Sequence, residues 1–388
     1  MSERFELDHN AGGRPRLEVV AALEAWLRED AANPSSVHAS GRRARDAVED
    51  ARASVANLVG AEPDEVIFTS GGTEANDLAL GGTLRAGDHV VASAIEHASV
   101  LRALEHLANG SQVTVTWLRP DAQGRIGPSD LAAALHPKTR LVTIGWANGE
   151  IGTVQDVAML AACAKRRAPG VLFHSDAVQA AGTLSIDARR AGVALLSLSG
   201  HKIGALPGVG ALVVERGVAI APRLRGGSQE RERRAGTENV PGIVSFGVAA
   251  RLARDARDAE ARRAARVKAA LWEVLATAAP VERLGPEDGL PGTLAVSFPG
   301  LRGDALVLAL DLAGVAASAG SACAAGAAEP SPVLLAIGCE ATVARGMIRL
   351  SFGPGFGEDD ARSAAARIVD VVRRARTALK RGAPSRAA

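Results

Sequence analysis

The sequence predicts an α/β protein with a large domain, built on a mostly parallel seven-stranded sheet with helices on both faces, and a small C-terminal α/β domain. Short apolar runs alternate with helical patterns over residues 66–215, which is typical of βαβ units. Several of these runs are continuously apolar, as strands covered on both faces require. Near residue 222 the pattern changes to a long Pro/Arg/Gly loop followed by an Ala/Arg helix.

The large-domain strands are short runs rich in Val, Ile and Leu, predicted at 66–69, 89–93, 112–118, 139–146, 171–175, 194–199 and 210–215. Helical patterns between them predict helices at 73–85, 98–108, 129–135 and 156–167. After the loop, a long helix is predicted at 243–276. The smaller unit is predicted to contain strands 293–298 and 347–351 and helices 304–312, 332–337 and 359–381.

Composition excludes several classes of protein. The chain has 388 residues, 47% hydrophobic and 23% charged, so it is globular and not intrinsically disordered. The net charge is only +2, so the composition lacks the excess of positive charge that is typical of nucleic-acid-binding proteins. Three cysteines without a CxxC pair argue against a disulfide framework or zinc ribbon and predict a reducing, cytoplasmic compartment. Residues 1–10 lack the apolar stretch of a signal peptide, and the uncharged run 312–328 is too short and too rich in Ala, Gly and Ser for a membrane span.

Two strand ends carry chemically informative side chains. The segment 174–179 reads HSDAVQ, and the segment 199–202 reads SGHK. The carboxyl ends of strands are where open α/β sheets bind ligands. A lysine there is a candidate Schiff-base residue, and a nearby aspartate suits a protonated pyridine nitrogen, so Lys202 and Asp176 suggest pyridoxal phosphate (PLP). Taken singly, the aspartate also fits a turn or cap residue, and the lysine also fits a solvated loop.

A phosphate site is predicted where SGGTE, residues 70–74, follows strand 66–69 and opens a helix. The free N–H groups and the dipole of a helix N-terminus favour an anion. A plain glycine turn with Thr73 as a cap is the alternative.

Ten motifs in consistent order make the chain resemble the cysteine desulfurases, PLP enzymes of fold type I in the class V aminotransferase group. They are LDHNAG, NPSSVHASGRRAR, EVIFTSGGTEAND, IEHASVL, WANGEIGTVQDV, HSDAVQAAG, SLSGHKIG, RRAGTENV, SAGSAC and IRLSFG. The resemblance implies that residues 1–15 belong to the small domain at the active-site rim and that 16–242 form the PLP-binding domain. It implies that 243–388 form the linking helix and the small domain carrying the Cys323 loop.

The resemblance also implies roles toward the cofactor. Lys202 would hold PLP in a Schiff base, and Asp176 would pair with the pyridinium nitrogen. Gln179 would bind the phenolic oxygen, and His97 would stack on the ring and assist proton transfers. The phosphate would be held by the remaining matched residues, which are Gly72, Thr73, Ser199, His201 and, from the other subunit of a homodimer, Thr237. No metal site is implied.

Roles toward the substrate follow from the same resemblance. Arg349 would grip the carboxylate of L-cysteine as a bidentate fork, with Asn148 beside it. Cys323 would take the sulfur as a persulfide, leaving L-alanine, and pass it to an iron–sulfur scaffold or another acceptor protein. The alternatives are a selenocysteine lyase or related PLP β-lyase, and an inactive PLP-binding subunit. One departure is that Gly12-Gly13 stands where the family usually has Thr-Thr, which removes two hydroxyls at the substrate entrance.

Overall fold

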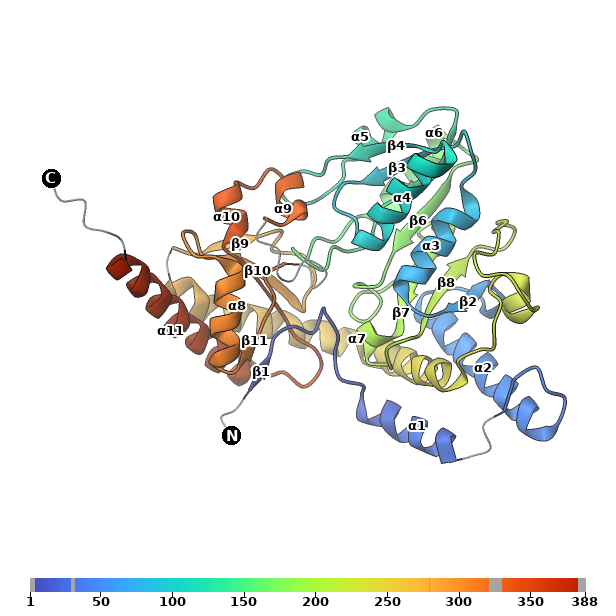
Figure 1. The fold of residues 1–388 in the computed structure, drawn as a ribbon, viewed down its shortest axis with the longest axis horizontal. Helices are drawn as coiled ribbons and strands as arrows, with labels where there is room; N and C mark the ends of the chain where they lie inside the picture. The colour runs from blue at the N-terminus through green and yellow to red at the C-terminus, as the bar shows by residue number, and fades with distance from the viewer. Residues whose placement is uncertain (1–3, 29–31, 279, 321–329, 383–388) are drawn as a thin grey trace.

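The structure is a computed structural model that describes residues 4–28, 32–278, 280–320 and 330–382. A large lobe built around a sheet and a smaller lobe lie side by side, and one long helix, α7 (Val240–Leu275), runs along both (Figure 1). Phe246, near its start, is buried in the core of the large lobe. Leu271, near its end, is buried in the core of the small lobe. This helix therefore ties the two cores together.

The large sheet has seven strands in the order β2-β8-β7-β6-β5-β3-β4. Strand β8 is antiparallel to both neighbours, and the other pairings are parallel, so the predicted mostly parallel sheet is confirmed. The bounds are β2 Val66–Thr69, β3 His89–Ser93, β4 Thr114–Leu118, β5 Thr139–Thr143, β6 Leu172–Asp176, β7 Leu195–Ser199 and β8 Gly210–Val214.

Helices cover both faces of this sheet, because successive strand residues point to opposite sides. Ile67 packs in the core beneath α3 (Gly72–Thr83) and α4 (Ala98–Ser111). Its neighbour Phe68 packs in the opposite core. That second core is covered by α1 (Leu17–Arg28), α2 (Ala39–Leu58), α5 (Pro128–Ala134), α6 (Val157–Arg167) and the first half of α7.

The small lobe is an antiparallel sheet covered by helices. Its order is β12-β10-β9, and a separate two-stranded unit pairs β1 with β11. The strands are β1 Phe5–Glu6, β9 Glu282–Leu284, β10 Thr293–Ser297, β11 Val315–Ala316 and β12 Met347–Ser351. The helices are α8 Gly303–Leu312, α9 Pro332–Ala336, α10 Ala341–Arg345 and α11 Glu358–Gly382. The N-terminal segment thus joins the small lobe through β1.

Some element bounds differ from those predicted. The strand predicted at 139–146 ends at Thr143, because the chain then turns into the loop whose Trp146 N–H donates to the Asp176 carbonyl. The helix predicted at 98–108 continues to residue 111. Helices α1, α2 and α10 and the short strands β1, β9 and β11 were not predicted.

Candidate active site

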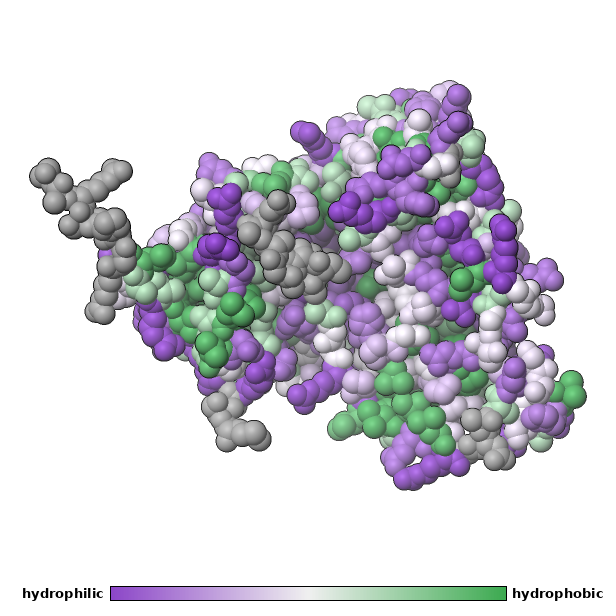
Figure 2. Space-filling view, in the orientation of Figure 1, coloured by the Kyte–Doolittle hydropathy of each residue, from purple (hydrophilic) through white to green (hydrophobic). Residues whose placement is uncertain are grey.

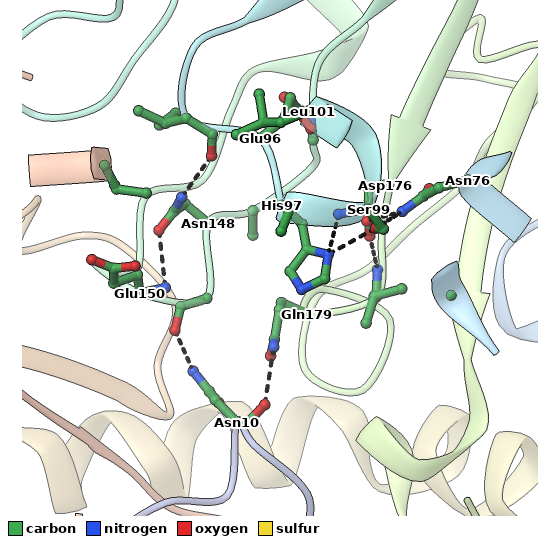
Figure 3. A pocket seen from close by; sticks show the side chains of 18 of the residues that line it. Asn10, Asn76, Glu96, His97, Ser99, Leu101, Asn148, Glu150, Asp176 and Gln179 are labelled. Carbon is green, nitrogen blue, oxygen red and sulfur yellow. Dashed lines mark hydrogen bonds between the residues drawn. The ribbon is translucent and has the colours of Figure 1, made fainter. Parts of the chain in front are cut away.

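A cavity of about 400 Å³ opens between the two lobes. Its floor is formed where β3, β5, β6 and β7 end and where α3 begins, and the small lobe adds Arg349 from β12 and Val333 from α9. Figure 3 shows polar side chains from these ends converging on one space. Such a crevice outside the carboxyl ends of sheet strands is the usual ligand site of an α/β fold.

Most of the predicted site residues line this one cavity. They are Gly72, Thr73, His97, Asn148, Asp176, Gln179, Ser199, His201, Lys202 and Arg349. Thr237 lies on an exposed loop before α7 and is not among the lining residues. Cys323 lies outside the residues that the structure describes. Among the described residues, no cluster of His, Cys, Asp and Glu could hold a metal ion, and no helix is long and apolar enough to cross a bilayer.

Lys202 reaches into the cavity from the short 3-10 helix Gly200–Ile203 that follows β7. Its Nζ donates to the carbonyls of Asn10 at 2.6 Å and Ala11 at 2.9 Å. Gln179 Nε2 also donates to the Asn10 carbonyl, at 3.2 Å (Figure 3). The amine is therefore held by neutral carbonyl acceptors, which leaves it able to exchange these bonds for a bound aldehyde.

Asp176 ends β6 and faces the same cavity. Its Oδ1 accepts from the Val178 N–H at 2.9 Å, and its Oδ2 accepts from Asn76 Nδ2 at 2.7 Å. Both oxygens are thereby oriented by the protein, and the carboxylate can still accept from a ring N–H because each oxygen carries two lone pairs.

An anion fits at the start of α3. The N-cap residue is Gly71, and no side chain caps the helix there, so the first N–H groups point outward unsatisfied by the helix itself. Ser199 Oγ and His201 Nδ1 lie 3.0 Å apart beside it. Burial, and then the charge of Lys202, lower the pKa of His201 to about 4, so this ring is a neutral hydrogen-bond partner at pH 7. These donors fit the phosphate of PLP, and Lys202 and Asp176 fit its aldehyde and pyridine nitrogen.

Arg349 is nearly buried, with 4% of its surface exposed. Its Nη2 contacts Asp8 Oδ1 at 2.7 Å, and its Nη1 donates to the Gly149 carbonyl at 3.3 Å. Its Nε is buried and has no hydrogen-bond partner among the described residues. An unpartnered guanidinium donor beside the cavity fits a carboxylate ligand. Asn148 holds the adjacent turn, because its Oδ1 accepts from the N–H groups of residues 150 and 151.

Of the two glycines that replace Thr-Thr, Gly13 has a structural explanation, whereas a Cβ at Gly12 would meet only ordinary contact, 3.8 Å from the His201 ring. A Cβ added to Gly13 would lie 2.2 Å from the His9 ring, and one added to Gly353 would lie 2.3 Å from it. His9 therefore fills the space that a larger residue at position 13 would need. Burial lowers the pKa of His9, and the charge of Lys202 lowers it further, so the imidazole beside the lysine is neutral.

Glu96 is a buried carboxyl group in the cavity wall, and it accepts from the Gly145 N–H at 2.7 Å. Burial raises its pKa from 4.5 to about 8. The native protein therefore holds a proton that the unfolded chain releases near pH 4.5. The stability that this proton contributes is complete below about pH 4.5 and is lost as the pH rises through 8.

Glu96→Gln should remove this slope while keeping an acceptor for Gly145. Between pH 5 and 9, the unfolding free energy of the unsubstituted protein should fall relative to the variant by on the order of 4 kcal/mol. Urea unfolding of both cofactor-free proteins at several pH values measures the difference. Parallel stability curves would show that Glu96 is ionised in the native protein.

Four site residues lie within the ten motifs, but the sequence alone indicated no role for them. Asn10 holds Lys202 through its carbonyl and donates through Nδ2 to the Gly149 carbonyl and Thr293 Oγ1, both at 2.9 Å. Asn76, Glu96 and Ser99 also line the cavity. Their only sequence signal was a polar side chain next to a strand end or in the first turns of a helix.

Known proteins resemble this chain both in sequence and in fold. The family model described as "Aminotransferase class-V" matches residues 6–362. "Putative cysteine desulfurase IscS 1" of Bacillus subtilis (strain 168) is 41% identical over 379 residues, covering 96% of this chain and 99% of that protein. A solved "NifS-like protein" superposes with a TM-score of 0.89 at 31% identity, covering 95% and 99% of the two chains. The structure described as "SspA in complex with cysteine" superposes with a TM-score of 0.78 at 31% identity, covering 90% and 99%.

Proposed function

The chain belongs to the class-V aminotransferase family and is a cysteine desulfurase, and from this premise we propose how its own residues carry out the reaction. The substrate is L-cysteine and the products are L-alanine and a persulfide on Cys323. The observation that supports this most strongly is that Lys202, Asp176 and Arg349, from two lobes of the molecule, line one cavity. The cysteine bound to SspA, a protein of similar fold, supports the choice of substrate.

The residues divide the work according to their positions. The amine of Lys202 holds PLP, and the cofactor when bound supplies an electron sink for negative charge at the substrate Cα. Asp176 would accept from the pyridine N–H, Gln179 would bind the phenolic oxygen, and His97 would cover the ring. The start of α3, at Gly72 and Thr73, would donate to the phosphate together with Ser199 and His201.

Substrate binding and proton transfer fall to the rest of the cavity. Arg349 binds the carboxylate of L-cysteine through its guanidinium group, and Asn148 shapes the turn beside it. Lys202, once its amine is released, is placed to move a proton at Cα. The cavity lies between the two lobes, which limits the access of water to these groups.

The sulfur goes to the thiol of Cys323. The carbon–sulfur bond of the substrate breaks, a sulfur–sulfur bond forms, and the thiol proton is returned to the carbon skeleton. L-cysteine and one thiol thereby give L-alanine and one persulfide, with no external oxidant or reductant. Transfer of this sulfur to an iron–sulfur scaffold or another acceptor protein completes the proposed role.

The proposed acceptor role of Cys323 is tested by measuring L-alanine formed from L-cysteine by PLP-loaded protein in the presence of a reductant. Cys323→Ala should lower the rate at least about a hundredfold, because the thiolate nucleophile is gone. The absorbance of bound PLP should stay unchanged. Cys339→Ala is the control, since burial raises the pKa of that half-buried thiol and keeps it protonated. Equal rates from both variants would favour a thiol-independent lyase, and no alanine from the unsubstituted protein would exclude the proposed reaction.

A homodimer is part of the proposal, because Thr237 is assigned to the partner subunit's phosphate site. The surface in Figure 2 carries an apolar area over α1, where Leu17 is 84% exposed and Leu27 is 59% exposed. Exposed apolar residues gathered in one area are typical of an interaction surface. A cytoplasmic location stays a prediction from the cysteine content.

A further inference from the structure

Four side chains in the cavity wall form one hydrogen-bonded bridge (Figure 3). His97 Nδ1 lies 2.7 Å from the hydroxyl of Ser99. The amide nitrogen of Asn76 donates to Ser99 Oγ at 2.8 Å and to Asp176 Oδ2 at 2.7 Å. His97, at the start of α4, is thus connected to Asp176, at the end of β6, through one residue of α4 and one of α3.

The donors of this bridge run in one consistent direction. A carboxylate only accepts, so the NH₂ group of Asn76 must face Asp176. The second hydrogen of that group goes to Ser99 Oγ, which leaves the hydroxyl hydrogen to donate to His97 Nδ1. The backbone N–H of Ser99 also donates to this nitrogen, at 3.1 Å. Because Nδ1 accepts, the ring proton of His97 sits on Nε2.

Asn76 leaves one of its own atoms unpaired. The residue is fully buried, and its Oδ1 has no hydrogen-bond partner in the part of the chain that the structure describes. An unpaired buried acceptor costs about 1–3 kcal/mol, so stabilising the fold does not explain an asparagine here. Turning the amide over would place Oδ1 against the carboxylate of Asp176 and break that bond. Ser99 could then bond Oδ1 only by donating its hydroxyl hydrogen to Asn76 and not to His97. The amide orientation therefore serves these two partners.

We propose that Asn76 and Ser99 are positioning residues that fix the Asp176 carboxylate at one end of the bridge and the tautomer of His97 at the other. This inference rests on the proposed function, in which His97 and Asp176 would both contact bound PLP. The bridge presents His97 to the ring and substrate as a hydrogen-bond donor through Nε2–H. It also keeps one lone pair of each Asp176 oxygen directed away from its protein donors and available to the pyridine N–H.

A double-mutant cycle tests the bridge. Asn76→Ala and Ser99→Ala should each lower kcat for alanine formation about tenfold, which is the loss of one net hydrogen bond of about 1.4 kcal/mol. The kcat of the double variant should be little lower than that of the less active single variant, because the two residues act as one unit. If the two losses were fully additive, Asn76 and Ser99 would act independently, and the proposal would be wrong.

Two further variants separate positioning from simple packing. Thr83→Ala is the matched control, since this residue is also buried on α3 but its hydroxyl bonds the Ala79 carbonyl within the helix. It should leave kcat unchanged. Ser99→Thr keeps a hydroxyl at the half-buried position and should retain most of the activity that Ser99→Ala loses. This comparison can be made even if Asn76→Ala folds poorly. If Ser99→Thr were as impaired as Ser99→Ala, the hydroxyl of residue 99 would not be the group that supports catalysis.

The tautomer is read directly by ¹⁵N NMR of cofactor-free protein labelled at histidine, with His97 assigned from the spectrum of His97→Gln. The unsubstituted protein should show the proton of His97 on Nε2. Ser99→Ala and Asn76→Ala should shift this resonance. A proton on Nδ1 in the unsubstituted protein, or identical spectra for all three proteins, would overturn the proposal. This readout needs neither PLP nor substrate, so its outcome is distinct from failure of the proposed function, which would appear as no alanine from the loaded protein.

Discussion

Lys202→Ala should abolish alanine formation, with a rate at least about 10⁴-fold below that of the unsubstituted protein. The substitution removes both the amine that holds the cofactor and the base at the substrate Cα, and a positioned base alone contributes about 10²–10⁴-fold. In the structure the amine donates to the backbone carbonyls of Asn10 and Ala11. Both residues line the cavity, where water can replace the lost donor. The fold should therefore survive, and thermal unfolding of both proteins checks this.

Lys268 provides the sharpest control for this prediction. It is the other lysine whose chemistry could mimic a Schiff-base residue, because burial lowers its pKa to about 8. Its Nζ, however, donates to the carbonyls of Glu287, Gly289 and Leu290, the last at 2.9 Å, and it does not line the cavity. Borohydride reduction of the loaded protein should attach the cofactor to Lys202 alone. Attachment at Lys268, or alanine formation by Lys202→Ala within tenfold of normal, would refute the assignment.

The sheet of the large lobe was predictable because each strand carries its own signal. Runs such as VIFT at β2 are apolar on both faces, and glycine-rich or polar turns separate them from the helices. Helix α2 was missed although its buried positions, among them Ala44, Val48 and Val55, repeat at helical spacing. Its many arginines and acidic residues hid this narrow apolar stripe. Strands β1 and β11 have two residues each, and only their pairing with each other defines them.

Some features of the site could likewise be predicted from the sequence, and others could not. Asp176 and Lys202 could be placed together from sequence because parallel strands end at one edge of a sheet. Contacts that depend on how the two lobes meet could not be predicted, such as the Arg349–Asp8 ion pair and the contact of Lys202 with Asn10. No local periodicity reports on residues so far apart in the chain. Ser99 and Asn76 were hidden for another reason, because a single polar residue in a helical segment is ordinarily a solvated one.

Arg349→Ala should lower kcat/KM for L-cysteine about 10³-fold, within the roughly 2–5 kcal/mol that removal of one partner of a buried charge pair costs. Two effects add at this position. The carboxylate of the substrate loses its guanidinium donor, and Asp8 loses the cation that contacts it at 2.7 Å. Both effects oppose binding of an anionic group, so KM should rise more than kcat falls.

Arg349→Lys separates charge from geometry. It restores the positive charge near Asp8 but cannot supply the planar fork, in which Nε is the donor without a partner among the described residues. It should therefore recover part of the loss and remain about tenfold or more below the unsubstituted protein. Arg345→Ala removes an exposed arginine from the adjacent helix α10 and should change kcat/KM by less than twofold. If Arg349→Lys were fully active, charge alone would account for substrate binding, and if Arg349→Ala were nearly normal, the substrate carboxylate would have to bind elsewhere.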